Sequence, residues 1–251
     1  MEPGLPIRCA VVIPAYNEAP SIADIALRAR RFCDLVIVVD DGSRDGTAQA
    51  LAQLPVTVLH NPANLGKGKS ICRGAHYALA RGASAVITLD GDGQHRPEDI
   101  PQLLDRAALQ PGDLIIAARL RGRHQAPALR RFANRCADFW ISWAAGQRIR
   151  DSQSGFRLYP AAVFRQCTTD SDGFVFESEI LIDAARRGIF TSAIAIDTLY
   201  DRDSRPSHYR LFTDTWSIVR MVARKLILRG LYPLGLLRSL GILPPSKMSR
   251  Q

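Results

Sequence analysis

SAVITLDGDGQH (residues 84–95) joins a short apolar run to two carboxylates on either side of a glycine. The apolar part is typical of a strand that is buried on both faces. A lone buried carboxylate is costly and two close carboxylates repel each other, so these aspartates need solvent or a cation beside them. Because open α/β sheets bind ligands outside the carboxyl ends of their strands, the end of this run is the first place to expect a binding site.

The alternation extends outward from this stretch in both directions. Short apolar runs that predict strands alternate with helical stretches, as in a parallel sheet with helices on both faces. The predicted strands are 9–14, 35–40, 56–60, 84–90 and 113–119, with a later one at 190–200. The predicted helices are 17–32, 44–53, 67–82, 97–109, 129–145 and 175–187, followed by a long helix from Ser207. The pattern predicts an α/β, doubly wound fold in one continuous domain.

Composition limits the compartment and the partners. The 251 residues are 47% hydrophobic, and the five cysteines are scattered without a Cys-x-x-Cys pair, which favours a reduced, cytosolic protein. No signal-peptide pattern is visible, and no stretch reaches the roughly 20 apolar residues of a membrane-spanning helix. A net charge of +9 indicates an anionic partner. Six arginines fall within 119–135, and seven basic residues and no acid fall within 220–251. These segments lack the stacking aromatics or recognition helix of a nucleic-acid binder, so nucleic acid is not expected.

Polar residues follow the predicted strands at what would be one edge of the sheet. The first strand ends in PAYNE (14–18), the second in DDGSRDGT (40–47) and the fifth in Arg119, while the third leads into NLGKGKS (64–70). A single Asp-Gly turn would be an ordinary surface turn. Five polar strand ends at one edge favour a ligand site instead.

NLGKGKS is similar to the end of a phosphate-binding P-loop. It lacks the glycine five positions before the final Gly-Lys, where Ala63 stands, so an NTPase is not expected. Lysines at this predicted helix start, Lys69 among them, can still meet a phosphate, because free N–H groups there favour anions. The alternative, for Lys67 above all, is a solvated helix end.

The two aspartates after the central run form a candidate metal site. Asp90 and Asp92 would point to the same side of an extended chain, with Gln94 on that face as a neutral oxygen ligand. Mg²⁺ or Mn²⁺ commonly uses one or two carboxylates plus substrate phosphates, and would stabilise a departing diphosphate. The alternative is an acidic turn that caps the helix beginning near Arg96.

Together these motifs resemble a known family. IPAYNE, VVDDGSRDGT, NLGKGKS and LDGDGQHRPEDI, in that order, resemble the inverting glycosyltransferases of family 2, which have the GT-A fold. DSQSGFRLYP (151–160) and GFVFESEILIDAARRG (173–188) are similar to the branch of dolichyl-phosphate mannose synthase and bacterial polyprenyl-phosphate sugar transferases. We expect a GT-A domain over 1–206, a basic amphipathic helical region over 207–243 and a flexible tail over 244–251.

The resemblance implies roles for individual residues on the donor side. Asp92 and Gln94 would coordinate the cation, and Asp90 would lie near the ribose or the metal. The residues that would hold the base and ribose of a nucleotide sugar are Pro14, Tyr16, Glu18 and, on the base, Asp41.

On the acceptor side, the resemblance assigns Arg119 and Arg131, with Asn134 nearby, to the acceptor phosphate. Arg202 and the Ser207-His208 pair match a late segment that closes over the diphosphate. The loop Ser154–Phe156 would shape the acceptor side.

The nature of the acceptor decides whether a base is needed. A phosphate monoester carries up to two negative charges at pH 7, so arginines are needed to position it and a base is not. The six arginines of 119–135 fit that need, although a solvated basic face is the alternative. A hydroxyl acceptor must lose a proton to a carboxylate within reach, and Asp151 is the candidate.

The C-terminal region has a pattern that suits a lipid partner. From Leu211 onward, large apolar residues alternate with Arg220, Arg224, Lys225 and Arg229. This pattern indicates a basic amphipathic helix in a membrane interface, with an ordinary core-packed helix as the alternative.

We therefore expect a metal-dependent inverting glycosyltransferase, peripheral on the cytoplasmic face of the membrane. It would move a sugar from a UDP- or GDP-sugar to a polyprenyl phosphate or related lipid. The alternatives are a family 2 enzyme acting on a hydroxyl of a glycolipid, polysaccharide or small molecule, and a non-catalytic nucleotide-sugar-binding protein.

Overall fold

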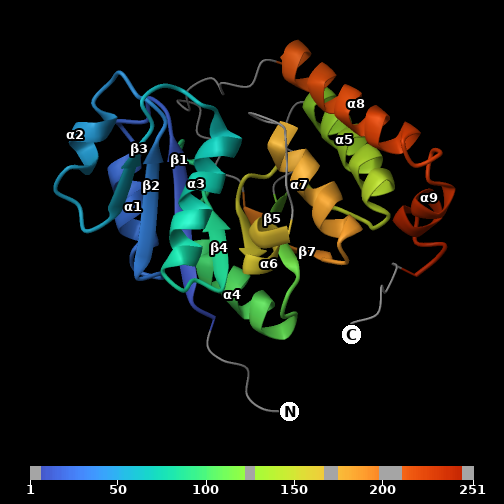
Figure 1. Cartoon of the computed structure of the whole chain (residues 1–251), viewed down its shortest axis with the longest axis horizontal. Helices are drawn as coiled ribbons and strands as arrows, with labels where there is room; N and C mark the ends of the chain where they lie inside the picture. The colour runs from blue at the N-terminus through green and yellow to red at the C-terminus, as the bar shows by residue number, and fades with distance from the viewer. Residues whose placement is uncertain (1–6, 122–127, 167–174, 198–210, 245–251) are drawn as a thin grey trace.

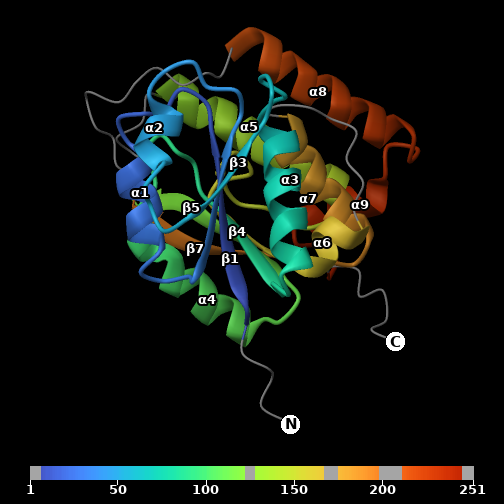
Figure 2. The ribbon, with the colours of Figure 1, turned by 60° about the vertical axis from the view of Figure 1, so that its left-hand side comes forward.

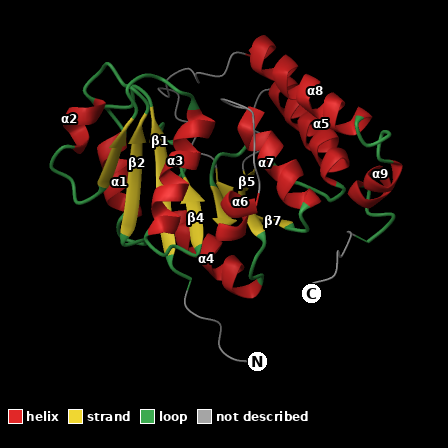
Figure 3. Cartoon of the chain, viewed as in Figure 1, coloured by secondary structure: helices red, strands yellow, loops and turns green. Residues whose placement is uncertain are grey.

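The computed structural model describes residues 7–121, 128–166, 175–197 and 211–244. Within these ranges a seven-stranded sheet lies between helices on both faces (Figures 1 and 3). The strands are β1 (Cys9–Ala15), β2 (Leu35–Asp40), β3 (Thr57–His60), β4 (Ala85–Thr88), β5 (Leu114–Arg121), β6 (Arg157–Pro160) and β7 (Thr191–Asp197). The helices are α1 (Ile22–Ala29), α2 (Thr47–Leu51), α3 (Lys67–Ala80), η1 (Pro97–Asp99), α4 (Ile100–Leu109), α5 (Ala128–Ala145), α6 (Ala161–Gln166), α7 (Val175–Arg186), α8 (Leu211–Ile227) and α9 (Pro233–Ser239).

The strand order is β3-β2-β1-β4-β6-β5-β7. Strands β1 to β4 are mutually parallel, β5 and β7 are parallel to each other, and β6 is antiparallel to both of its neighbours. After β3 the chain crosses to the other side of β1 to form β4. The carboxyl ends of β1 and β4 therefore flank a switch point, where sheets of this kind leave a crevice for ligands.

Alternation along the strands builds a core on each face of the sheet. In β1, Ala10 and Val12 face one layer, while Val11 and Ile13 face the other, and all four are fully buried. Apolar residues of α3, α5, α7 and α8 complete the first core, and those of α1 and α4 complete the second. Figure 2 shows α3 and α7 on the side of the sheet away from α1 and α4. Each buried Val or Ile contributes about 1.5–3 kcal/mol, which is why these runs form the sheet.

The α/β, doubly wound architecture is confirmed, with two elements that the sequence analysis missed, β6 and α6; α9 lies within the helical region predicted over 207–243. Strand β6 has four residues and begins with Arg157, so it lacks the apolar run that identifies the other strands. Several predicted boundaries were also wrong. The strand predicted over 84–90 ends at Thr88, and the helix predicted over 17–32 begins at Ile22.

Helix α8 packs on the domain, as the core-packed alternative for the C-terminal region predicted, and its contact with a membrane stays a prediction. Ile218, Val222 and Leu226 are buried in the core. Lys225 lies 2.6 Å from Asp183 and 3.0 Å from Glu179, both on α7. The opposite side is exposed, so α8 packs on the domain through one face only. No helix among the described residues is long and apolar enough to cross a membrane.

Arg157 joins the loop before β6 to α7. Its side chain is fully buried and donates hydrogen bonds to the carbonyl oxygens of Ser152, Ser154 and Glu177 at 2.8, 2.7 and 2.6 Å. It also donates to the hydroxyl of Tyr159 at 3.3 Å. A buried guanidinium is tolerated here because these acceptors replace the water it has lost.

We predict that Arg157→Met lowers the free energy of unfolding by about 3 kcal/mol or more, because each buried carbonyl left without a donor costs about 1–3 kcal/mol. Urea unfolding followed by circular dichroism measures the loss. Arg187→Met, at an exposed position of the same domain, is the matched control and is expected to change little. Equal effects of the two substitutions would contradict the role given to Arg157.

Candidate functional site

The loop after β1 is fastened to the loop after β2. The backbone N–H of Asn17 donates to Ser43 Oγ at 2.9 Å, and that of Glu18 donates to Thr47 Oγ1 at 2.9 Å. The residues predicted to hold the base and ribose lie half-buried on or beside this loop: Pro14, Tyr16 and Glu18. Their grouping fits a nucleotide site, and their contacts with a nucleotide stay a prediction.

Asp41, predicted to contact the base, is buried and bound to its own chain. Its oxygens accept hydrogen bonds from Asn61 Nδ2 at 2.6 Å and from the backbone N–H groups of Leu65 and Gly66 at 2.9 and 2.8 Å. The carboxylate therefore fixes the loop that leads into Lys67, and its contact with a base stays a prediction.

Lys67 and Asp90 form the charged centre of the site. The Nζ of Lys67 lies 2.7 Å from Asp90 Oδ1 and 2.9 Å from Glu177 Oε1, which α7 supplies. Burial disfavours the charged form of Lys67, yet the two carboxylates outweigh it and raise its pKa. Burial likewise opposes ionisation of Asp90, but Lys67 and then His95 hold its pKa below the ordinary value. The solvated helix end considered for Lys67 is therefore wrong.

Asp92 and Gln94 lie in a turn, because β4 ends at Thr88. The prediction that Asp90 and Asp92 lie on an extended chain is therefore wrong. The backbone N–H of Gln94 donates to Asp92 Oδ1 at 3.0 Å, and the Asp92 side chain is exposed at the surface. Partial loss of hydration, and then the charge on Asp90, raise the pKa of Asp92.

His95 follows this turn and is buried. Its ring is 3% exposed and packs against Phe156, with the ring centroids 5.5 Å apart. Nε2 lies 3.9 Å from Asp90 Oδ2, while Nδ1 has no hydrogen-bond partner among the residues that the structure describes. Burial lowers the pKa of His95 to about 4, so the ring is neutral at pH 7.

Gly155 lets the loop before β6 press against Asp90. A Cβ atom at this position would lie 2.5 Å from Asp90 Oδ2, closer than any side chain permits. The carbonyl of Gly155 accepts a hydrogen bond from Thr88 Oγ1 at 2.7 Å, which holds the loop there. The orientation of Asp90 is thus set by Lys67 on one side and by a side-chain-free residue on the other.

Arg119 and Asp151 form a two-pronged ion pair. The Nε and Nη2 of Arg119 lie 2.9 and 2.7 Å from the two oxygens of Asp151, and the Arg119 backbone N–H donates to Oδ2 at 2.7 Å. Burial opposes ionisation of Asp151, but Arg119 holds its pKa below the ordinary value. A carboxylate that is engaged in this way and resists protonation is poorly suited to act as a general base.

The remaining predicted site residues are Arg131, Lys69, Arg202 and the Ser207-His208 pair. Arg131 lies half-buried in the first turn of α5, and Lys69 is exposed in the first turn of α3. Arg202 and the Ser207-His208 pair lie outside the described residues.

The donor set fits a hard divalent cation that also binds substrate. Among the described residues, no group of three or more His, Cys, Asp or Glu side chains is placed to hold a metal. Mg²⁺ and Mn²⁺ do not need such a cage, because they are commonly bound by one or two carboxylates and substrate phosphates. Asp90 and Asp92 offer this arrangement, and partial loss of hydration followed by the charge on Asp90 raises the pKa of Asp92.

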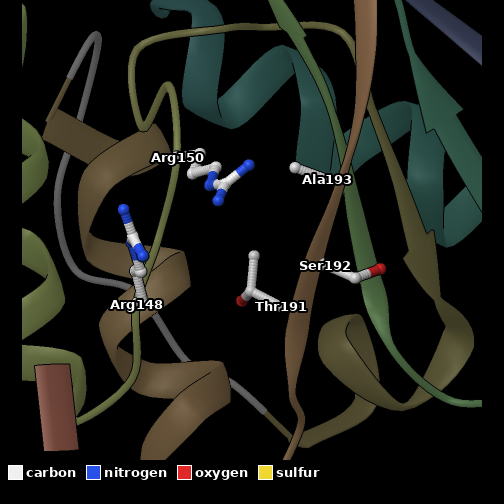
Figure 4. A pocket seen from close by; sticks show the side chains of 5 residues that line it. All are labelled: Arg148, Arg150, Thr191, Ser192 and Ala193. Atoms are coloured by element: carbon white, nitrogen blue, oxygen red, sulfur yellow. The ribbon is translucent and has the colours of Figure 1, made fainter. Parts of the chain in front are cut away.

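A separate hollow of about 180 Å³ lies between β7 and the loop after α5 (Figure 4). Arg148, Arg150 and Thr191 lie on one side of β7, whereas the hydroxyl of Ser192 points away from the two arginines. None of these residues was predicted as part of the site.

Sequence reasoning gave no role to Glu177 or Arg157. The available signal for Glu177 was an acidic residue inside the largely apolar run 175–182, where a carboxylate needs a partner. Arg157 offered no comparable signal, because a single arginine after the polar loop 150–155 reads as a surface residue.

Comparison with known proteins gives a consistent picture. Residues 10–167 match the family described as glycosyl transferase family 2. A polyprenol monophosphomannose synthase of Mycolicibacterium smegmatis is 31% identical over 204 residues, covering 75% of this chain and 76% of that protein. An undecaprenyl-phosphate mannosyltransferase of Micrococcus luteus is 31% identical over 198 residues, covering 72% and 79%.

Solved structures confirm the GT-A fold. Mannosyl-3-phosphoglycerate synthase from Rubrobacter xylanophilus superposes with a TM-score of 0.67 at 18% identity, covering 98% of this chain and 78% of that one. Glucosyl-3-phosphoglycerate synthase from Mycobacterium tuberculosis, in complex with Mn²⁺, UDP-glucose and phosphoglyceric acid, gives 0.65 at 21% identity, covering 88% and 79%.

We predict that Gly155→Ala weakens binding of Mn²⁺ by about ten-fold, because its methyl group would displace the Asp90 carboxylate. Electron paramagnetic resonance of bound and free Mn²⁺ measures the affinity. Gly46→Ala is the control, since a Cβ there would meet its nearest neighbour at an ordinary 3.6 Å. Unchanged affinity in Gly155→Ala would remove Asp90 from the metal site.

Proposed function

Since this chain belongs to glycosyl transferase family 2, we propose that it transfers a sugar from a UDP- or GDP-sugar to a polyprenyl phosphate, with inversion at the anomeric carbon. Relatives named for polyprenol phosphate and undecaprenyl phosphate support this acceptor class. The observation that carries it is the ion pair of Asp151 with Arg119. This pair engages the carboxylate that a hydroxyl acceptor would need as a base, whereas a phosphate acceptor needs none.

On the donor side, Pro14, Tyr16 and Glu18 bind the nucleoside in this proposal. Asp90, Asp92 and Gln94 hold Mg²⁺ or Mn²⁺, which when bound stabilises the negative charge on the departing nucleoside diphosphate. The solved neighbour that contains Mn²⁺ and UDP-glucose supports a divalent cation in a fold of this kind.

On the acceptor side, Arg119 and Arg131 position the phosphate. Asp151 orients the guanidinium of Arg119 through two contacts, and an oriented guanidinium pairs with two phosphate oxygens. The attacking oxygen already carries negative charge, so Arg119 and Arg131 serve to hold it in line with the anomeric carbon. Arg202 remains a predicted donor-binding residue outside the described part of the chain.

The C-terminal helices form the membrane contact in this proposal. Their exposed apolar side chains are Trp216, Val219, Ile227, Leu228, Leu231, Leu234, Leu240 and Ile242. No acidic residue occurs from Trp216 to the end of the sequence, while Arg220 and Arg224 are exposed beside them. Apolar insertion combined with basic residues near anionic lipids is how peripheral proteins bind a bilayer. We place the enzyme on the cytoplasmic face.

We predict that purified protein forms a sugar phospholipid from a UDP- or GDP-sugar and a short polyprenyl phosphate when Mg²⁺ or Mn²⁺ is present. Asp92→Asn is expected to lower the rate by at least the roughly 100-fold that loss of an outer-shell metal partner reaches. Mass spectrometry of the products gives both results. Asp105→Asn, at an exposed position of α4, is the control.

The alternatives give different products. Transfer to a hydroxyl acceptor in place of the phosphate would overturn the acceptor assignment. Tight, metal-dependent nucleotide binding without any transfer would make the protein a non-catalytic binder. Near-normal rates in Asp92→Asn would remove the metal assignment.

We predict that the double substitution Ile227→Ser and Leu228→Ser lowers binding to vesicles of anionic lipid by about ten-fold, because two large apolar side chains lose their burial in the interface. Co-sedimentation with vesicles measures the bound fraction. Leu109→Ser is the control, because Leu109 is 78% exposed but lies at the end of α4. An equal loss in both proteins would argue against a membrane face on α8.

A further inference from the structure

Lys67 is held by two carboxylates from different parts of the chain. Lys67 begins α3, Asp90 follows β4, and Glu177 lies in the first turn of α7. The side chains of Lys67 and Glu177 are 20% and 8% exposed. A lysine has a flexible four-carbon stem, so a single contact leaves its ammonium mobile. Two contacts from separate elements fix its position relative to the sheet.

Close packing of α7 on α3 brings Glu177 to Lys67. A Cβ atom at Gly68 would lie 2.7 Å from the Cβ of Phe176, so only glycine allows the two helices to approach this closely. The carbonyl of Glu177 also accepts a hydrogen bond from Arg157 at 2.6 Å. Helix packing thus explains why position 68 is a glycine. Glu177 is held through both its backbone carbonyl and its side chain.

The position of the Asp90 carboxylate depends on how the Lys67 ammonium is shared between Asp90 and Glu177. With Glu177 present, the ammonium lies between two carboxylates at similar distances of 2.7 and 2.9 Å. If Glu177 loses its charge, Asp90 becomes the only one of these two groups that can balance Lys67. The ammonium is then drawn toward the oxygens that a divalent cation would use, because both compete for the same negative charge.

We infer that Glu177 is a positioning residue for the donor side of the site: by anchoring Lys67, it keeps the Asp90 carboxylate oriented and available to the divalent cation. This role rests on the proposed function, which assigns the cation to Asp90 and Asp92. It requires no contact between Glu177 and substrate. Glu177 acts on the cation through Lys67.

The test compares Glu177→Gln with Glu179→Gln. Both substitutions remove one negative charge from the same helix. The two residues are similarly buried, with 6% and 8% of their whole-residue surface exposed. Glu179 pairs with Lys225 at 3.0 Å. Mn²⁺ binding to the protein without nucleotide, measured by electron paramagnetic resonance, is expected to weaken about ten-fold in Glu177→Gln. Glu179→Gln is expected to stay within about two-fold of the wild type.

A double-mutant cycle separates action through Lys67 from a direct effect of charge. In a Lys67→Met background, Glu177→Gln is expected to change Mn²⁺ affinity by less than about two-fold. A further loss near ten-fold in that background would mean that Glu177 acts directly on the cation. In transfer assays, the Mn²⁺ concentration for half-maximal activity should rise in Glu177→Gln, while kcat at saturating Mn²⁺ stays within about two-fold of the wild type.

The outcomes distinguish this inference from the proposed function. If the wild type binds Mn²⁺ and transfers sugar while both glutamine variants bind Mn²⁺ equally well, only the role of Glu177 is overturned. If the wild type does not bind Mn²⁺, the metal assignment fails and the inference fails with it. If Glu177→Gln does not fold, Gly68→Ala, which pushes α7 away from α3, should weaken Mn²⁺ binding in the same way. Unchanged affinity there would overturn the inference.

Discussion

The site depends on the buried guanidinium of Arg157. Its hydrogen bonds to Ser152, Ser154 and Glu177 tie the loop before β6 to the start of α7. That loop carries Asp151, which orients Arg119, and Gly155, which presses on Asp90. The start of α7 carries Glu177, which holds Lys67. One charged group with no exposed surface therefore holds in place both the Lys67–Asp90 centre and the Arg119–Asp151 pair, because its acceptors cannot be replaced by water.

On both sides of the site, charged groups are held by ion pairs within the chain. Lys67 pairs with Asp90 and Glu177, and Arg119 pairs with Asp151. The proposed function, with an anionic donor and an anionic acceptor, would bring several charges together in a partly dehydrated space. Groups already held by ion pairs need little reorganisation when such ligands arrive, which is the basis of electrostatic preorganisation. Asp92 differs, since it is exposed and its pKa is raised beside Asp90.

The sequence was sufficient for the architecture, because most strands are short, largely buried apolar runs, as in β1, β2, β4 and β5. It was also sufficient to group Asp90, Asp92 and Arg119 at one edge of the sheet, since the ends of parallel strands meet there. It did not reveal β6, whose first residue is an arginine, or the pairing of Lys67 with Glu177, which are 110 positions apart. Contacts of that kind depend on how helices pack, and a helix periodicity shows which face is buried but not which neighbour it meets.

Helix α7 forms ion pairs with two neighbouring helices, α3 and α8. Glu177 faces Lys67 beside the sheet, while Glu179 and Asp183 hold Lys225 of α8. Helix α8 and the charged centre of the site are thus both anchored on α7. This limits how the protein can be recombined with its relatives. A chimera whose exchanged α8 carries no lysine at position 225 would leave two acids of α7 without their partner, so α8 is best exchanged together with α7.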